Sequence, residues 1–254
     1  MTFARATLLA LAVVAPLVLS GCLGVETTRE KSAKRARLAA HRIANQKGLT
    51  IGKVNPSVRV EQSAVVQDPN GVAAVIRIKN RGSTQAGVPV AVTVSDAHGK
   101  KLYANNIPGL DPSLVSVSVL EAGQDTYWVN NQILVAGKAK GLKAEVGVAR
   151  VPAVSGSVPK ITLAGIHEGH DQDGFFAKGS VRNDSSVAQK RLVISCVARA
   201  GQKIHAAGRA IIERLPPASE AKKPTSFTVY FIGDPKGAPL DCAAPPTVLP
   251  GGAK

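Results

Sequence analysis

The sequence predicts an all-β protein built from two antiparallel β-sandwiches in tandem. Short segments rich in valine and isoleucine alternate with polar residues over most of the chain, and turn residues separate them about every 8–12 positions. No long segment of this region has the apolar spacing of an amphipathic helix. Several features of the first half return in the same order in the second half, which predicts an internal repeat.

The first 21 residues have the three zones of a secretory signal peptide. A short start with one positive charge, Arg5, precedes an apolar segment at residues 6–18, and small residues follow it up to Cys22. The apolar segment is shorter than the roughly 20 residues that a membrane-spanning helix needs. We therefore expect residues 1–21 to direct export and to be removed.

The end of this leader reads Leu19-Ser20-Gly21-Cys22 and resembles the lipobox of bacterial lipoproteins. The resemblance implies cleavage before Cys22 and attachment of a diacylglycerol to its sulfur. Two acyl chains hold a protein stably on a membrane, whereas one chain binds marginally. The expected location is therefore extracytoplasmic, with a lipid anchor in the cell membrane. The alternative is an ordinary signal peptide that ends near a cysteine by accident.

Residues 22–52 predict a basic, helix-prone stalk. Alanines favour a helix, but large apolar side chains are too few to pack on a core. Near an anionic surface each basic residue adds about 1 kcal/mol of binding energy, which salt screens. The stalk is either a contact with such a surface or a soluble spacer. The candidate contact residues are Arg29, Lys31, Lys34, Arg35, Arg37 and Arg42.

The whole chain is strongly basic, with 32 basic and 17 acidic residues and a formal net charge of +15. Loss of Arg5 with the leader leaves 31 basic residues. This charge favours an anionic partner, either lipid headgroups or an acidic cell-wall polymer, although a general compositional bias is the alternative. Nucleic acid is not expected, because the chain is exported and only 4% of its residues are aromatic. Beyond the stalk the basic residues are scattered along the sequence.

Residues 53–150 predict the first sandwich. Residues 88–95 place a valine at every second position, so the four valines share one face and are expected in the core. Pro89 lies near the start of this strand, where a missing N–H donor is tolerated. The other expected strands are residues 57–61, 75–79, 101–103, 114–120, 126–129 and 142–148.

Residues 151–159 predict a linker rich in proline, serine and glycine, and residues 160–254 predict the second sandwich. Asn80 and Asn183 follow similar strands, and the glycine of the next hairpin comes 19 residues later in one copy and 18 in the other. Turns with proline at 110–112 and 215–217, and aromatic strands at 127–129 and 227–231, follow in both copies.

The second copy, residues 160–249, resembles the FxLYD-type immunoglobulin-like domains of bacterial envelope proteins. The Leu-Tyr-Asp motif itself is absent, because the strand reads Val-Ala-Arg-Ala at 197–200. The first copy is more loosely similar to adhesion-type immunoglobulin-like modules. The resemblance implies two immunoglobulin-like sandwiches and defines no active site. Its matching residues are Gly179-x-Val181-x-Asn183-x-Ser185, Gly201-x-x-Ile204, Leu215-Pro216-Pro217 and Phe227-x-Val229-x-Phe231.

Two cysteines, Cys196 and Cys242, remain once Cys22 carries lipid. An oxidising compartment favours a disulfide between them, and two buried thiols are the alternative. Cys196 shares a strand face with Leu192 and Ile194, and we expect this face to be buried. A bridge would close a loop of about 45 residues and stabilise the fold by roughly 3–4 kcal/mol in the chain-entropy model.

Residues 167–174 form the one segment that suggests a metal. Zinc accepts histidine and carboxylate ligands, and the acidic end of the segment resembles part of a calcium loop. That loop is incomplete, because its twelfth position is Arg182 and not glutamate. The alternative is a polar hairpin loop at 166–175. The candidate ligands are His167, His170, Asp171 and Asp173.

The remaining motifs of catalysis are missing from the sequence. It has no Gly-x-Ser-x-Gly, no glycine-rich phosphate loop, and otherwise isolated histidines. Tyr127 and Trp128 are adjacent on an expected strand and point to opposite faces. One of them is either an exposed platform for sugars or cover for a sheet edge, while the other packs in the core.

We therefore expect a protein that is not an enzyme and carries no cofactor. It would act as a binding or scaffolding module at the bacterial cell envelope, with an unidentified protein partner. The alternative is a metal- or small-solute-binding accessory lipoprotein of a transport system. The clefted architecture of a solute receptor needs larger α/β lobes, which favours the scaffold.

Overall fold

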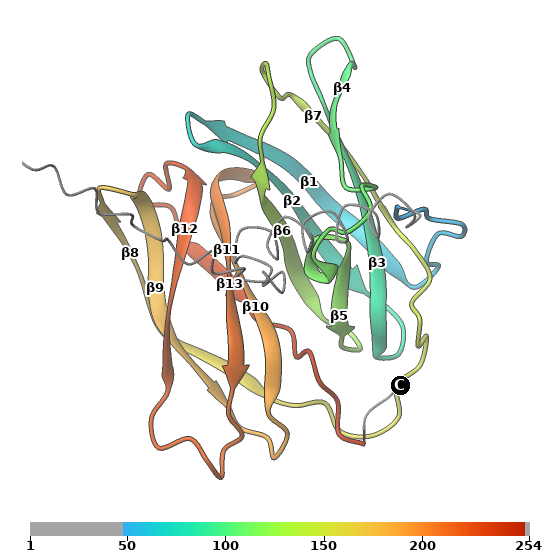
Figure 1. Cartoon of the computed structure of the whole chain (residues 1–254), viewed down its shortest axis with the longest axis vertical. Helices are drawn as coiled ribbons and strands as arrows, with labels where there is room; N and C mark the ends of the chain where they lie inside the picture. The colour runs from blue at the N-terminus through green and yellow to red at the C-terminus, as the bar shows by residue number, and fades with distance from the viewer. Residues whose placement is uncertain (1–47, 252–254) are drawn as a thin grey trace, which may run out of the picture. The chain divides into compact units, whose positions relative to one another are not determined.

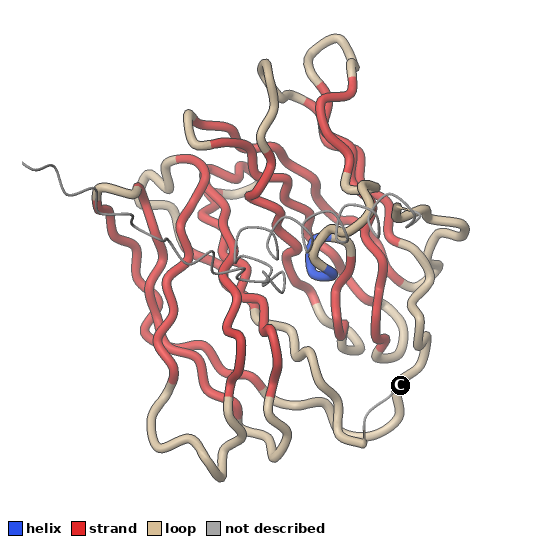
Figure 2. Tube along the Cα trace, viewed as in Figure 1, coloured by secondary structure: helices blue, strands red, loops and turns tan. Residues whose placement is uncertain are grey.

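The fold is known from a computed structural model of the chain, which describes residues 48–251. Within this range the regular structure consists of β-strands and one short 3₁₀ helix (Figure 2). The all-β prediction is thus confirmed. The leader, Cys22 and the six basic stalk candidates lie outside the described residues.

The first half contains two antiparallel sheets, and their strands can be followed in Figure 1. One sheet has the order β1-β2-β6. In the other, β3 is the central strand and pairs with β4, β5 and β7. A 3₁₀ helix, η1 (Pro112–Leu114), precedes β5, so this strand begins slightly later than predicted. The strands are β1 (Val58–Asp68), β2 (Gly71–Asn80), β3 (Gln85–Ser95), β4 (Lys101–Ala104), β5 (Ser116–Leu120), β6 (Asp125–Ile133) and β7 (Gly141–Val146).

The core of the first half lies between these two sheets. The predicted stripe of Val88, Val90, Val92 and Val94 is at most 2% exposed and faces β2 and β6. Trp128 joins this core from β6. Alternation of apolar and polar residues with a period of two was therefore sufficient to identify the buried face of β3.

The second half forms a six-stranded sheet in the order β13-β10-β11-β12-β9-β8. Only three residue pairs, at residues 206–208 and 231–233, join β11 to β12. The strands on the two sides of this junction bury their inner faces in one shared core. Leu192 and Ile194 of β10 belong to this core together with Phe227 and Val229 of β12. The strands are β8 (Ile161–Asp171), β9 (Gly174–Asn183), β10 (Gln189–Ala200), β11 (Lys203–Leu215), β12 (Thr225–Gly233) and β13 (Leu240–Ala243).

The two halves share one connectivity. In each, the first strand pairs with the second, and the second pairs with the next-to-last strand, giving β2 with β6 and β9 with β12. The third strand pairs with the last, giving β3 with β7 and β10 with β13. Immunoglobulin sandwiches pair their strands B with E and C with F in the same way. The repeat expected from the sequence is therefore present in the topology.

The halves also contact each other directly. The outer face of β1, β2 and β6 packs against residues of β10, β11 and β12 in a third apolar cluster. All the described residues belong to one compact unit. The predicted linker at 151–159 begins alongside β3, where Val151 bridges to Ala86 and Val154 N donates to Thr84 O at 2.8 Å.

Candidate functional site

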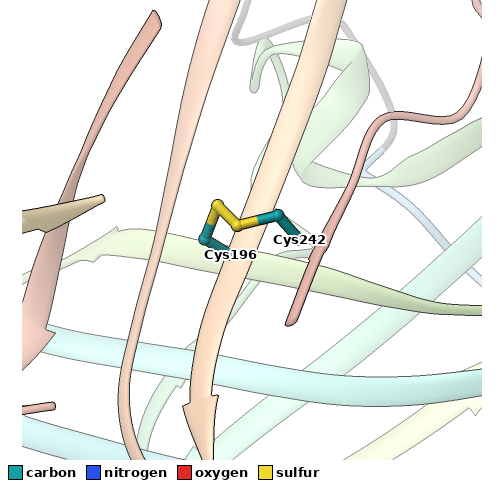
Figure 3. Close-up of a disulfide and its surroundings, with 2 residues drawn as sticks. All are labelled: Cys196 and Cys242. Carbon is teal, nitrogen blue, oxygen red and sulfur yellow. A yellow bond between two sulfur atoms is a disulfide. The ribbon is translucent and has the colours of Figure 1, made fainter. Parts of the chain in front are cut away.

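Cys196 and Cys242 are joined by a disulfide, as predicted, with Cα atoms 4.1 Å apart (Figure 3). The two residues lie directly opposite each other in the register of β10 and β13. Cys196 is fully buried in the core of the second half. The bridge therefore attaches the last, four-residue strand to the centre of the domain.

A buried glutamine holds the segment that follows this strand. Gln189 Oε1 accepts hydrogen bonds from Thr247 N at 2.7 Å and Val248 N at 3.0 Å. Gln85 occupies the same strand position in the first half and accepts a bond from Asn55 Nδ2 at 2.7 Å. Sequence reasoning overlooked both residues. The signal was a glutamine five or six residues after the repeated asparagine in each copy.

The alternative of a polar hairpin at 166–175 is confirmed, but its loop is shorter than expected. β8 continues through Asp171, and only a two-residue turn separates it from β9. Because side chains alternate along a strand, His167 and His170 point to opposite faces. Strand pairing with β9 extended further into this polar segment than its composition suggested.

The metal candidates make local contacts instead, and His167 Nδ1 lies 3.0 Å from Gly165 O. Asp171 Oδ1 accepts a hydrogen bond from Asp173 N at 2.9 Å, and Asp171 Oδ2 accepts one from the hydroxyl of Tyr230 at 3.0 Å. The His170 ring lies 4.7 Å from that of Phe175. Across residues 48–251, no three histidine, cysteine or acidic side chains gather in a way that could hold a metal ion.

Tyr127 and Trp128 do point to opposite faces of β6, but both are 4% exposed. Trp128 faces its own core and donates from Nε1 to Ser113 O at 3.0 Å. Tyr127 faces the second half, in the cluster between the halves. The idea that one ring is an exposed platform or an edge cover is wrong, because the second half covers that face of the sheet.

A buried arginine lies where the two halves meet beside η1. Arg209 of β11 is 7% exposed, and its Nη2 donates to Ser113 Oγ at 2.6 Å. Its Nε and Nη1 are buried without a partner among the described residues. Burial lowers the pKa of Arg209, while the charge of Asp111 opposes that shift. The arginine therefore connects the halves while remaining only partly satisfied.

Asp111 organises the first-half side of this junction. Its carboxylate accepts a hydrogen bond from Ser113 N at 2.9 Å, and this bond caps η1. The same carboxylate accepts hydrogen bonds from the Ser113 hydroxyl and from the Arg191 guanidinium. Although desolvation raises the pKa of Asp111, the bonds from Ser113 and the charge of Arg191 lower it overall. The predicted proline turn is thus a point of contact with the second half.

Five exposed lysines gather at one end of the first half, where the turn between β3 and β4 lies beside the loop between β6 and β7 (Figure 1). Pairing of Ser95 with Gly141 and the bond from Lys140 N to Ser95 O, at 2.8 Å, bring the turn and the loop together. We name this cluster the lysine end. It consists of Lys100, Lys101, Lys138, Lys140 and Lys143.

Sequence reasoning missed the lysine end, because its members are separated by up to 43 positions (Lys100 to Lys143) and look scattered. A hollow of about 590 Å³ lies at this end, lined by Lys138 and Lys140 together with Gln67 and Asp68. Gln67 fixes the loop, since its Nε2 donates to Gly137 O at 2.9 Å and its Oε1 accepts Ala139 N at 2.8 Å.

No protein-family model matches the chain. No curated protein matches it either. In the part of the chain that the structure describes, no helix has the length and apolar character needed to cross a membrane.

Proposed function

We propose that this chain is an extracytoplasmic lipoprotein, anchored to the cell membrane through Cys22, that serves as a non-catalytic binding or scaffolding module of the bacterial envelope. The observation that carries the proposal is the disulfide between Cys196 and Cys242. Stable disulfides form in oxidising compartments, outside the cytoplasm. The bridge uses both cysteines of the folded part and leaves Cys22 as the third and last thiol of the chain.

The way the folded part uses its polar side chains supports a scaffolding role. Asn80, Gln85, Asn183 and Gln189 are all buried, and each bonds to neighbouring loops or segments of the chain. These side chains hold the strands and loops in place relative to one another. They do not converge on one point as catalytic groups would. Recognition by such a module would use its exposed loops and sheet edges.

The expected partners are the membrane itself and an anionic surface, either lipid or cell-wall polymer, together with an unidentified envelope protein. The stalk candidates Arg29, Lys31, Lys34, Arg35, Arg37 and Arg42 would supplement the acyl chains in this contact.

Exchange of Cys22 tests the proposal. The full chain and its Cys22→Ser variant are expressed in a bacterial host that is fed a labelled palmitate analogue. The unaltered chain is expected in the membrane fraction with label, and Cys22→Ser in the soluble fraction without label. Ser32→Ala, which lies outside the lipobox-like segment, is the control and should behave like the unaltered chain. Membrane association and labelling that survive Cys22→Ser would contradict the proposal.

A further inference from the structure

We infer that the lysine end is a further contact site, which lies in the folded part, and that it binds the anionic lipid headgroups of a bilayer. The inference rests on the proposed lipid anchor, which would keep the protein beside such a surface. It adds to the stalk a contact formed by residues far apart in sequence, and it assigns an orientation to the folded part.

The first argument is that most of these lysines have no ion-pair partner. Within the described residues only Lys143 of the five lysines has an ion-pair partner, Glu145 at 2.9 Å. At the opposite end of β2, Arg77 binds Asp125 at 2.7 Å and Arg81 binds Glu61 at 3.0 Å, whereas Arg59 and Lys79 have no ion-pair partner among the described residues. The lysine end therefore keeps a net positive charge that can attract an external anion.

Three carboxylates lie at the same end, and the backbone hydrogen bonds that two of them accept hold them in place without cancelling their charge. Asp96 accepts the N–H groups of His98 at 2.8 Å and Lys100 at 2.9 Å within its own turn. Asp68 accepts Gly233 N at 2.8 Å. With Glu145 bound to Lys143, these three carboxylates form the acidic side of the cluster, and they are outnumbered by the five lysines.

The second argument selects a bilayer over a soluble polymer. Leu134, which starts the loop between β6 and β7, is 82% exposed. This loop also contains Lys138 and Lys140. An apolar side chain exposed in the same loop as basic residues can enter the acyl boundary of a membrane while the ammonium groups meet phosphates. A polyanion in water would give Leu134 no such environment.

The length of the tether allows this orientation. Twenty-six positions separate Cys22 from Gly48, which limits the reach between them to about 90 Å. A chain of this reach does not dictate which end of the folded part meets the membrane. The distribution of charge and of exposed apolar surface would then decide the orientation.

A vesicle-binding experiment tests the inference on the chain that carries Cys22→Ser and therefore no lipid. Binding is measured by flotation with vesicles of phosphatidylcholine alone, or with about one third phosphatidylglycerol. The test variant exchanges four lysines of the cluster for glutamine. These exchanges are Lys100→Gln, Lys101→Gln, Lys138→Gln and Lys140→Gln.

The matched control removes the same charge from exposed positions of the second half. We expect the test variant to lose at least about tenfold in affinity for phosphatidylglycerol vesicles at low salt, and the control about twofold. Circular dichroism and the unfolding midpoint verify that each variant is folded. The control exchanges are Lys160→Gln, Lys203→Gln, Lys222→Gln and Lys223→Gln.

Equal losses in the test and control variants would overturn the inference, because the effect would then follow net charge alone. Leu134→Ser should weaken vesicle binding with no change in charge, and an unchanged affinity would contradict the bilayer assignment. Lysine-dependent binding to soluble polyglutamate without vesicle binding would also contradict it. None of these results depends on lipidation, so a failed Cys22 experiment is distinguishable from a failed vesicle experiment.

Discussion

Asn80 and Asn183 occupy the same place in the two halves, each as the last residue of the second strand. Both are fully buried. Each side-chain Oδ1 accepts the N–H two residues further on, from Gly82 at 3.0 Å and from Ser185 at 3.1 Å. The repeat therefore extends from strand order to the hydrogen bonding of one turn, and the asparagine keeps that turn's buried polar groups satisfied.

Replacement of these asparagines by alanine should lower the free energy of unfolding more in the first half than in the second. Asn80 Nδ2 donates to Ser83 O, Leu120 O and Glu121 O at 2.8, 3.1 and 2.9 Å, whereas Asn183 Nδ2 donates to Val187 O at 2.8 Å. We expect Asn80→Ala to lower the free energy of unfolding by about 3 kcal/mol and Asn183→Ala by about 2 kcal/mol. Urea unfolding measures both, and the reverse order would refute this account.

Loss of the disulfide should destabilise the fold strongly. The bridge closes a separation of 46 residues, so its removal in Cys196→Ala/Cys242→Ala should lower the free energy of unfolding by about 3–4 kcal/mol. A reducing agent should weaken the unaltered chain by a similar amount and leave the double variant unaffected. A chain whose stability is the same with and without reductant would contradict the disulfide.

Two tyrosine hydroxyls should respond differently to removal. The Tyr103 hydroxyl accepts Asn130 Nδ2 at 3.1 Å, whereas that of Tyr127 is buried with no partner in the described part of the chain. Tyr103→Phe should therefore lower the free energy of unfolding by about 1 kcal/mol, and Tyr127→Phe should leave it unchanged or raise it slightly. Chemical unfolding of both variants checks this, and a costly Tyr127→Phe would show that its hydroxyl has a partner.

The Asp111 junction should give the stability a dependence on acid pH. Its folded-state pKa is lowered, so its contribution is fully present above the unfolded value near pH 4 and is lost as the pH falls through the folded value. The stability difference between the unaltered chain and Asp111→Asn should thus be constant from about pH 7 to 5 and shrink below about pH 4. A difference that stays constant down to about pH 2 would mean that Asp111 is not perturbed.

Local pattern predicted the strands and the faces they bury. The alternation at Val88–Val94 placed four side chains in the core, and Leu192, Ile194 and Cys196 behaved likewise. The disulfide followed from counting cysteines in a chain that was expected to be exported. These features depend on periodicity and on residue type, both of which are present in the sequence itself.

Contacts between distant segments escaped the sequence analysis. Tyr127 is buried because the second half covers its sheet, a packing that no pattern within β6 encodes. The turn that carries Lys100 and the loop that carries Lys138 lie at the same end because β3 pairs with both β4 and β7. The segment at 167–171 is polar in composition, yet pairing with β9 makes it a strand. In each case the deciding interaction joins residues far apart or depends on a partner strand.

The central claim is that Cys22 is the lipid-bearing first residue of the mature protein. The most direct test is the intact mass of the protein purified from membranes in detergent. The account predicts a chain that begins at Cys22 and is heavier by at least one thioether-linked diacylglycerol. A chain that begins at any other residue, or an unmodified Cys22, would contradict it.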